Sequence, residues 1–285
     1  MISCAVNPAC GREIDYGLTP AREIKNVMAI GGGVAGLETA RVCAIRGHKV
    51  TLLEKSVKLG GNLLPGGAPD FKEDDIALAN WYEDQLRDLN VPVKFNALVT
   101  KEMDKEFNAD AVIVATGSIP KMLKIDNANN VYSAEDVLLE RKETGNSTVI
   151  IGGGLVGCEL ALDLADKGKK ITIVEMQNGI LQVGGPLCHA NEDMLKDLVK
   201  FKKIDVRTGS YVSKAAGNGF VVNTGDKEEL VEADSAVVAI GYVSQKSLYD
   251  EIKFDVPEIH LLGDANKVAN IMYAVWDAYE VARNI

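Results

Sequence analysis

Two glycine clusters, each followed by a glutamate, are the residues of this sequence whose spacing most clearly indicates chemistry. Gly31, Gly33 and Gly36 fit the pattern G-x-G-x-x-G, and Glu54 follows Gly31 by 23 residues. Glycines at these positions permit a tight turn, let a pyrophosphate approach the backbone and let a helix pack closely on a strand. An acid at this distance accepts the hydroxyls of a ribose. The pattern therefore predicts a dinucleotide-binding turn.

The same pattern returns later in the chain. Gly152, Gly154 and Gly157 repeat the glycine spacing, and Glu175 again follows the first glycine by 23 residues. Every matched position differs by 121, so that Gly31 corresponds to Gly152 and Glu54 to Glu175. One such motif is weak evidence, whereas two with matched spacing are strong. We expect two dinucleotide sites in one chain.

The elements around each cluster support this interpretation, because the motif requires a strand, a turn, a helix and a second strand. Apolar runs predict strands, and apolar residues at helical spacing predict helices. Around the first cluster we expect a strand at 25–30, a helix at 34–46 and a strand at 48–54. Around the second we expect a strand at 147–151, a helix at 155–167 and a strand at 169–175. The helices open at Val34–Ala35 and at Leu155–Val156. A helix start offers free N–H groups and partial positive charge to phosphates.

Three further segments are expected to end strands beside a ligand. "ADAVIVATG" ends at Ala115, Thr116 and Gly117, and "ADSAVVAIG" ends at Gly241. "EIHLLGD" ends at Gly263 and Asp264 and precedes a helical segment with apolar spacing that includes Ile271. Glycines at strand ends let the backbone pass close to a ligand at the carboxyl edge of a sheet. All three segments are predicted to contribute to the two sites.

Composition excludes several classes of protein. The net charge of −10 argues against nucleic acid as a partner, because phosphates repel an acidic surface. No apolar run approaches the roughly 20 residues of a membrane helix, and the first residues lack a signal-peptide pattern, so a cytoplasmic location is expected. The five cysteines contain no C-x-x-C pair. Cys43, Cys158 and Cys188 are expected to be small buried residues.

The ordered motifs resemble those of the two-dinucleotide-binding flavoprotein superfamily. Besides the two glycine clusters they comprise "LGGN" at 59–62, "ATG" at 115–117 and "GD" at 263–264. The resemblance implies an α/β fold of two Rossmann-like domains, with the nicotinamide domain inserted in the FAD domain. The expected ranges are 1–24 for a leader that links to a barrel, 25–119 and 246–285 for the FAD domain, and 120–245 for the NAD(H) domain.

The resemblance also carries roles to individual residues. Glu54, followed by Lys55, is expected at the adenosine ribose of FAD, and Asp264 at the ribityl or pyrophosphate region. Gly60, Gly61 and Asn62 are expected to lie alongside the flavin. The terminal helix, beginning near Ile271, would present its positive end to the pyrimidine edge of the flavin.

The N-terminal segment narrows the resemblance. "SCAVNPACGRE" at 3–13 and "GGNLLPGGAPDFKEDD" at 60–75 resemble the 2-enoate reductase and 2,4-dienoyl-CoA reductase branch, which is related to old yellow enzyme. Full-length members carry an FMN-binding barrel and a 4Fe-4S cluster, and Cys4 matches the fourth cluster ligand. A cluster takes four thiolates, so Cys4 is a metal ligand only in a full-length protein. The barrel half is expected as a partner, in the same chain or as a separate subunit, and a homo-oligomer is left open.

These features together predict the electron-input module of an NADH-dependent flavin oxidoreductase. The resemblance implies that hydride passes from NADH to FAD, and that electrons then pass through the cluster and FMN to the C=C bond of an enoate or enoyl-CoA. Glu175 is followed by "MQNG", without an arginine for a 2′-phosphate, which favours NADH over NADPH. Hydride transfer needs no acid or base side chain, so no catalytic residue is expected. Two alternatives stay open, namely a non-catalytic module with ADP in the first site and a flavoprotein of the disulfide-reductase type.

Overall fold

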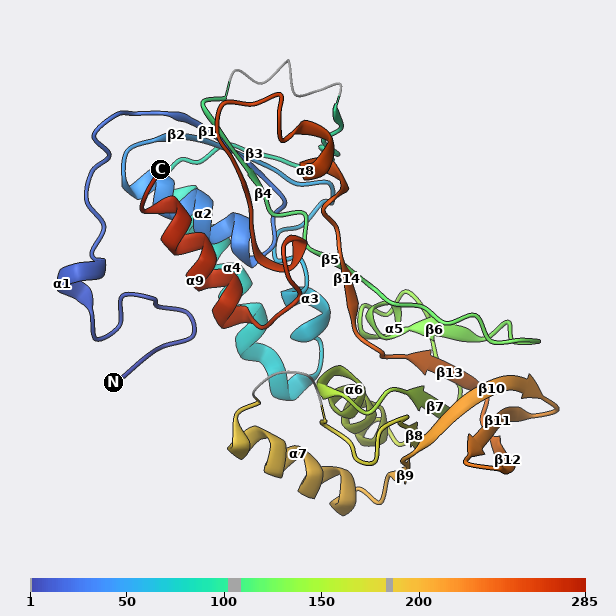
Figure 1. The fold of residues 1–285 in the computed structure, drawn as a ribbon. Helices are drawn as coiled ribbons and strands as arrows, with labels where there is room; N and C mark the ends of the chain where they lie inside the picture. The colour runs from blue at the N-terminus through green and yellow to red at the C-terminus, as the bar shows by residue number, and fades with distance from the viewer. Residues whose placement is uncertain (1, 102–108, 183–186) are drawn as a thin grey trace. The chain divides into compact units, whose positions relative to one another are not determined.

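The computed structural model describes residues 2–101, 109–182 and 187–285. The chain forms two compact units (Figure 1). The first comprises Met1–Gly67, Glu73–Ile119 and Val243–Ile285, and the second comprises Ala68–Lys72 and Pro120–Tyr242. The second unit therefore interrupts the first in sequence, and its main segment is the one that carries the second glycine cluster.

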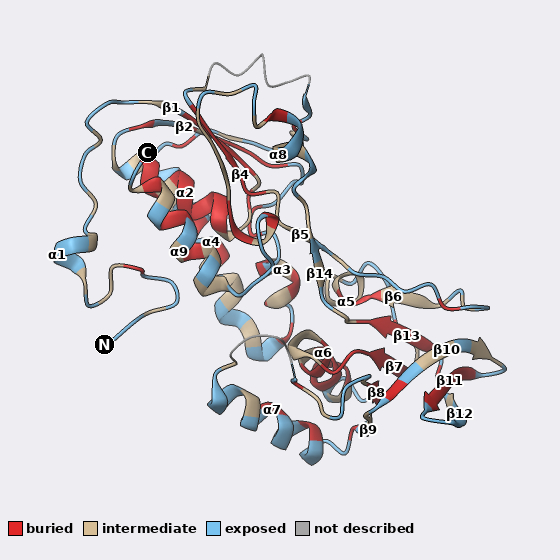
Figure 2. Ribbon diagram, viewed as in Figure 1, coloured by how far each residue is buried: buried red, intermediate tan, exposed pale blue. Residues whose placement is uncertain are grey.

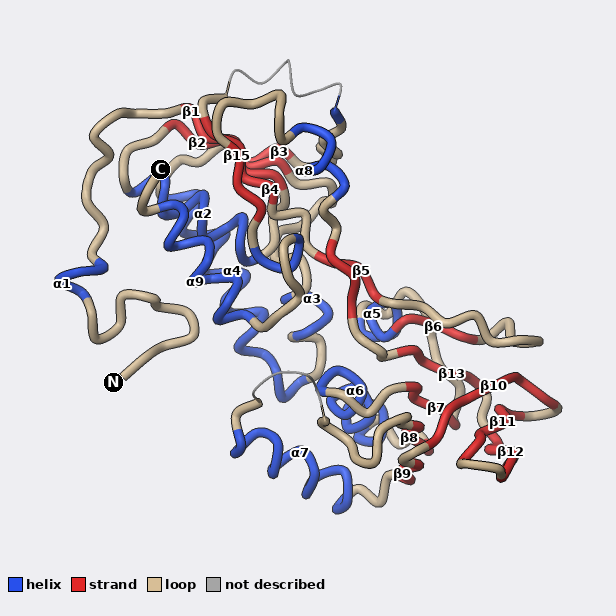
Figure 3. Tube along the Cα trace, viewed as in Figure 1, coloured by secondary structure: helices blue, strands red, loops and turns tan. Residues whose placement is uncertain are grey.

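The first unit is built on a five-stranded parallel sheet with the order β15-β4-β1-β2-β3 (Figure 3). Its strands are β1 (Asn26–Ile30), β2 (Lys49–Leu53), β3 (Val93–Lys94), β4 (Ala111–Val114) and β15 (Ile259–Leu261). The strand that follows β1 in the chain, β2, lies on one side of β1, whereas β4 lies on the other side of β1, so the order of strands reverses at β1. Ligands of open α/β sheets bind at such a switch point, outside the carboxyl ends of the strands.

Helices cover both faces of this sheet. One face carries α2 (Val34–Ile45), α4 (Glu73–Asp88) and α9 (Ile271–Ala282), with α2 packed against both of the others (Figure 1). The short helix α8 (Ser247–Ile252) packs on the other face. The first unit also contains the short segments α3 (Leu63–Gly66) and η3 (Gly263–Ala265), whereas η1 (Asp70–Lys72) lies in the part of the chain assigned to the second unit.

The strands of this sheet are apolar along their whole length because helices cover both of its faces. In β1, Val27 and Ala29 face the α2 side, whereas Met28 and Ile30 face the opposite core. Figure 2 shows the central strands of this sheet and much of α2 in red, as buried. Successive side chains of a strand point to opposite faces, so a strand buried on both faces is apolar throughout. The core around α2 also holds Leu37, which is fully buried.

The N-terminal segment packs on the first unit. It contains one helical turn, α1 (Glu13–Tyr16), although the sequence shows no periodicity there. The ring of Tyr16 stacks on that of Tyr279 in α9, with centroids 6.5 Å apart. The indole N–H of Trp276 donates to the Cys4 carbonyl at 3.0 Å. These contacts fix the segment to one side of α9.

The second unit repeats the plan of the first. Its parallel sheet has the order β6-β13-β7-β8-β9, so that β13, β7, β8 and β9 correspond to β4, β1, β2 and β3. The strands are β6 (Val131–Ser133), β7 (Ser147–Ile151), β8 (Lys170–Val174), β9 (Asp205–Arg207) and β13 (Ser235–Val238). The helices are α5 (Ala134–Leu138), α6 (Leu155–Asp166) and α7 (His189–Phe201). The predicted strand–turn–helix–strand order is confirmed in both units.

An antiparallel sheet completes the second unit, formed by β10 (Ser210–Ala216), β11 (Gly219–Thr224) and β12 (Lys227–Glu232). The two segments that join the units, β5 (Ser118–Pro120) and β14 (Tyr242–Ser244), form a two-stranded sheet.

Two of the three cysteines predicted to be buried are buried. Cys43 in α2 and Cys158 in α6 are inaccessible, and burial raises the pKa of each thiol to about 12. The prediction for Cys188 was wrong, because this residue is exposed at the N-cap of α7. It stands at the N-cap, before the first helical turn of α7.

Candidate dinucleotide-binding sites

The first glycine turn connects β1 to α2 and leaves no room for side chains at two positions. Gly31 has a φ of +109°, and a Cβ there would collide with the carbonyl oxygen of Ala115 at the end of β4. A Cβ on Gly36 would collide with the carbonyl oxygen of Gly31. The first glycine is thus required by backbone conformation and crowding, and the third by the close packing of helix on turn.

Gly33 differs from its neighbours because the space beside it is open. The nearest atom to a Cβ built there is the Cα of Gly61, at 4.0 Å. Gly33 is the N-cap of α2, and the first turn of that helix has no acidic residue. No side chain of the helix's own first turn therefore neutralises its free N–H groups and the positive end of its dipole. A pyrophosphate fits this cradle without displacing a side chain.

Glu54 is fastened to the glycine turn. Its Oε2 accepts a hydrogen bond from the Gly32 N–H at 2.6 Å, and its Oε1 accepts one from the Ser56 N–H at 2.7 Å. Only 7% of the residue is exposed. Each carboxylate oxygen keeps a lone pair, so the group can still accept bonds from a ribose. The acid and the turn form one rigid unit at the carboxyl edge of the sheet.

The second unit reproduces this geometry. Gly152 has a φ of +110° and lies against the carbonyl of Ala239, while a Cβ on Gly157 would collide with the Gly152 carbonyl. Glu175 accepts hydrogen bonds from the Gly153 N–H at 2.6 Å and the Gln177 N–H at 2.8 Å. Gly154 caps α6, whose first turn again has no acidic residue. Each unit thus has the same arrangement of a glycine turn and a glutamate bonded to it. We call this arrangement a half-site.

Polar side chains from three segments meet beside the first half-site. The hydroxyl of Ser118 donates to Asp264 Oδ2 at 2.8 Å. The amide of Asn62 lies 3.2 Å from the Ser118 hydroxyl and 3.5 Å from Asp264 Oδ2. The backbone N–H of Ala269 donates to Asp264 Oδ1 at 3.1 Å. These segments follow β2, β4 and β15, whose carboxyl ends share one sheet edge, so the carboxylate is held in one orientation.

The remaining predicted residues lie at the expected ends of elements. Those of the first unit gather around its sheet edge: Val34 and Ala35 open α2, Lys55 follows Glu54, Ala115, Thr116 and Gly117 follow β4, Gly263 opens η3, and Ile271 opens α9 behind its cap Asn270. Those of the second unit do the same: Leu155 and Val156 open α6, and Gly241 follows β13. The structure brings each set together within its own unit.

Sequence reasoning missed several residues of these sites. Gly32 and Gly153 supply the N–H groups that hold the two acids. Both occupy unassigned positions of the motif, although their identical offset of 121 was a signal that could have found them. Ser118 gave no such signal, because its role depends on β15 returning beside β4.

Cys4 does not provide a complete metal site in this chain. Among the residues that the structure describes, no group of three or more histidine, cysteine or acidic side chains is placed to hold a metal ion. Cys4 contributes its carbonyl to Trp276 and has a half-buried side chain. The residues present therefore do not fit an iron–sulfur cluster by themselves.

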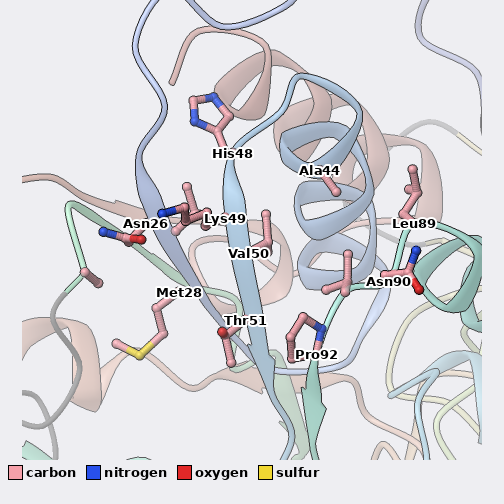
Figure 4. Close-up of a pocket in the computed structure, with 13 residues that line it drawn as sticks. Asn26, Met28, Ala44, His48, Lys49, Val50, Thr51, Leu89, Asn90 and Pro92 are labelled. Atoms are coloured by element: carbon pink, nitrogen blue, oxygen red, sulfur yellow. The ribbon is translucent and has the colours of Figure 1, made fainter.

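A separate hollow lies at the opposite, amino edge of the first sheet (Figure 4). It has a volume of about 530 Å³ and is lined by residues including Asn26, His48 and Asn90. His48 accepts the Lys25 N–H at its Nδ1, and its Nε2 is buried with no hydrogen-bond partner in the described part of the chain. Because that nitrogen has no accessible surface, it does not offer a donor to the hollow.

Within the described ranges, no helix is both long enough and apolar enough to cross a membrane.

One chain that carries two anchored glycine turns on two parallel sheets can hold two dinucleotides, which is the defining feature of a class of nucleotide-dependent oxidoreductases. The family model described as pyridine nucleotide-disulphide oxidoreductase matches residues 25–266. The chain belongs to this family.

Similar proteins extend the comparison. The chain is 65% identical over 284 residues to a cinnamate reductase from Clostridium sporogenes, which covers 100% of the chain and 43% of that protein. It is 35% identical over 296 residues to an NADH oxidase from Thermoanaerobacter brockii, covering 100% of the chain and 44% of the relative. A 2-naphthoyl-CoA reductase complex superposes with a TM-score of 0.92 at 29% identity, covering 99% of this chain and 43% of the other. The chain thus spans less than half the length of these relatives.

Proposed function

We propose that this chain is the electron-input module of an NADH-dependent flavin oxidoreductase. The observation that carries the proposal is the repetition of one anchored half-site in two units, including both hydrogen bonds of each glutamate. The first unit would hold FAD and the second the pyridine nucleotide. When bound, these cofactors supply the hydride chemistry, and no side chain has to act as acid or base.

The residues of the first unit fit FAD. The open space at Gly33 admits the pyrophosphate, and Glu54 accepts from the adenosine ribose while remaining fixed to the turn. Asp264, which accepts a hydrogen bond from Ser118, would contact the ribityl or pyrophosphate region. The N-terminus of α9, which Asn270 caps and whose first turn has no acidic residue, would favour negative charge on the flavin ring.

The second unit would select NADH. Its Glu175 carboxylate accepts the 2′-hydroxyl of the adenosine ribose and repels the 2′-phosphate of NADPH. Arg207, whose backbone carbonyl bonds the Glu175 N–H, directs its guanidinium to Asp205 and Glu229 at 2.9 and 2.8 Å. That guanidinium is therefore engaged with two carboxylates rather than offered to a phosphate.

The activity of the whole protein is proposed from its similarity to longer relatives. A partner half that binds FMN in a barrel, with a 4Fe-4S cluster to which Cys4 contributes, would receive the electrons and reduce the C=C bond of an enoate or enoyl-CoA. The relatives named a cinnamate reductase and a 2-naphthoyl-CoA reductase support this class of substrate. A cytoplasmic location is part of the same proposal. This chain by itself would oxidise NADH only with artificial acceptors.

Colour tests the proposal directly. The purified chain is expected to become yellow with FAD and to bleach when NADH is added without oxygen. A colourless protein that binds ADP but not FAD would instead establish a nucleotide-binding module without redox function. A flavoprotein of the disulfide-reductase type is disfavoured, because Cys43 and Cys158 lie in different units, are buried and have raised pKa values.

A further inference from the structure

Arg207 lies beside the acid of the second half-site. The Glu175 N–H donates to the Arg207 carbonyl at 2.8 Å, because β8 and β9 run parallel with Val174 opposite Arg207. Two residues further on, the Gly209 N–H donates to the Gln177 carbonyl at 2.8 Å. The segment that begins at Arg207 therefore follows the loop after Glu175, where the adenosine ribose of a pyridine nucleotide is proposed to lie.

Two carboxylates hold the side chain of Arg207. Its Nε donates to Asp205 Oδ2 at 2.9 Å, and its Nη1 and Nη2 donate to Glu229 Oε2 and Oε1 at 2.8 and 3.4 Å. A guanidinium presents its N–H donors in a planar fork that matches a carboxylate and a phosphate alike. Glu229 thus occupies the pair of nitrogens that a phosphate would bind.

Glu229 reaches Arg207 from the antiparallel sheet of the same unit. It lies in β12, opposite Val222 of β11, whereas Arg207 is the last residue of β9. The antiparallel sheet begins at Ser210, whose N–H donates to the Glu175 carbonyl at 2.9 Å. The sheet therefore starts at the ribose loop, and its third strand brings a carboxylate back to the cation beside that loop.

The exposure of this ion pair makes its role separable from folding. The side chains of Arg207 and Glu229 are 36% and 59% exposed. Ion pairs between exposed side chains contribute little to stability, because water competes for both partners. Arg207 keeps its charge whether or not a carboxylate is present. Loss of Glu229 would therefore leave the unit folded and release one edge of the guanidinium.

We infer that Glu229 is a positioning residue for nucleotide specificity, because it keeps Arg207 from binding the 2′-phosphate of NADPH. The inference rests on the proposed function and deepens it. Glu175 disfavours the phosphate by its own charge, whereas Glu229 acts only through Arg207 and touches no nucleotide. The preference for NADH thus depends on two carboxylates, one beside the glycine turn and one in the antiparallel sheet.

The variant Glu229→Ala tests the inference in the background of Glu175→Gln, which removes the repelling charge but keeps an acceptor for the Gly153 N–H. Calorimetry gives the dissociation constants of NADPH and NADH without requiring hydride transfer. Removing Glu229 from this background should strengthen NADPH binding roughly tenfold, while NADH binding changes less than about twofold. Adding Arg207→Ala should abolish the gain, because the released guanidinium is its source.

A single variant keeps the test informative if the double variant is insoluble. Glu229→Ala alone should strengthen NADPH binding about threefold, a smaller gain because Glu175 still repels the phosphate. An NADPH affinity that stays within the error of the wild type in this variant overturns the inference. A gain that survives the further change Arg207→Ala also overturns it.

Glu228→Ala is the matched control. Glu228 is the neighbour of Glu229 in β12 and is exposed, and successive side chains of a strand point to opposite faces. The control removes the same charge without releasing Arg207, so the ratio of the two dissociation constants should stay within about twofold of its background. An equal gain of NADPH affinity in Glu228→Ala would mean that net charge alone matters, and it would contradict the inference.

Failure of the inference and failure of the proposed function give different results. A wild-type chain that binds neither NADH nor NADPH overturns the proposed function. A wild-type chain that binds NADH, together with Glu229 variants that keep its full preference, overturns only the inference.

Discussion

Glu54 accepts the backbone N–H of Gly32 at 2.6 Å, and this bond fastens the acid at the end of β2 to the turn that follows β1. The carboxylate is therefore more than a ribose acceptor. It also satisfies a buried N–H group of a loop whose conformation a ligand must meet. Glu175 repeats the bond to Gly153 at the same distance. In each unit the acid and its glycine turn are thus held together by the chain's own hydrogen bonds.

Replacing Glu175 should change the choice of pyridine nucleotide. In Glu175→Ala the acceptor for the 2′-hydroxyl and the charge that repels a 2′-phosphate both disappear. We expect the preference for NADH over NADPH to fall roughly tenfold, equivalent to about 1.4 kcal/mol. The ratio of kcat/KM for the two nucleotides, with FAD and an artificial acceptor, measures it. Glu175→Gln separates the causes, since it removes the charge but keeps an acceptor; an unchanged ratio in both variants would exclude Glu175 as the determinant.

Replacing the third glycine of one turn by alanine should abolish nucleotide binding in that unit alone. Gly36→Ala would drive a Cβ into the Gly31 carbonyl, and Gly157→Ala would do the same at Gly152. Overpacking of this kind costs about 1–3 kcal/mol and distorts the turn. FAD titration should show loss only in Gly36→Ala, and NADH titration loss only in Gly157→Ala.

The chain offers matched controls for these two variants. Gly47 and Gly168 are separated by the same 121 positions, have φ values of +94° and +79°, and have nothing within 4 Å of an added Cβ. Gly47→Ala and Gly168→Ala should keep both affinities. Equal losses in controls and test variants would mean that general destabilisation, not the turn, is responsible.

Thiol labelling should divide the cysteines by burial. Cys43 and Cys158 have pKa values raised to about 12, so roughly one molecule in ten thousand carries the thiolate at pH 8. Cys188 is exposed and should react first with a disulfide reagent in the native protein. Cys43 and Cys158 should react only when the chain unfolds. Mass spectrometry of partly labelled protein checks this order, and early labelling of Cys43 would contradict the buried position in α2.

Stability should depend on pH through His48. Burial, and then the nearby Arg46 and Lys25, lower the pKa of His48 below its ordinary 6.5. The unfolded chain then binds a proton more readily than the folded chain, so the free energy of unfolding should decrease as pH falls below 6.5. The decrease ends once pH is below the folded-state pKa.

Urea unfolding at several pH values measures this effect. His48→Gln should show a smaller loss of stability between pH 7 and pH 5, values that bracket roughly the ordinary histidine pKa. His189→Gln, at an exposed position in α7, serves as the control and should follow the wild type. A wild-type slope retained in His48→Gln would assign the pH dependence to other groups.

Much of the fold follows from local pattern. The helices α2 and α6 begin at the predicted residues, because a glycine with no Cβ ends the strand and apolar spacing continues beyond it. The buried strands were visible as apolar runs, since both faces of each parallel sheet are covered. Cys188 shows the limit of this reasoning. An apolar residue type does not by itself reveal whether another element covers its position.

The sequence by itself determined the two glycine turns, their acids and the common offset of 121, because these depend on residue type and short-range spacing. Only the tertiary structure decided which distant segments meet at them. Ser118 binds Asp264 across 146 positions of the chain because β15 returns beside β4, and no local pattern encodes that pairing. Likewise, the close approach of Gly61 to Gly33, where a Cβ added to Gly61 would lie 2.9 Å from the Gly33 Cα, depends on the path of a whole loop. Short-range patterns specify elements, whereas sites between elements are specified by how the sheet is ordered.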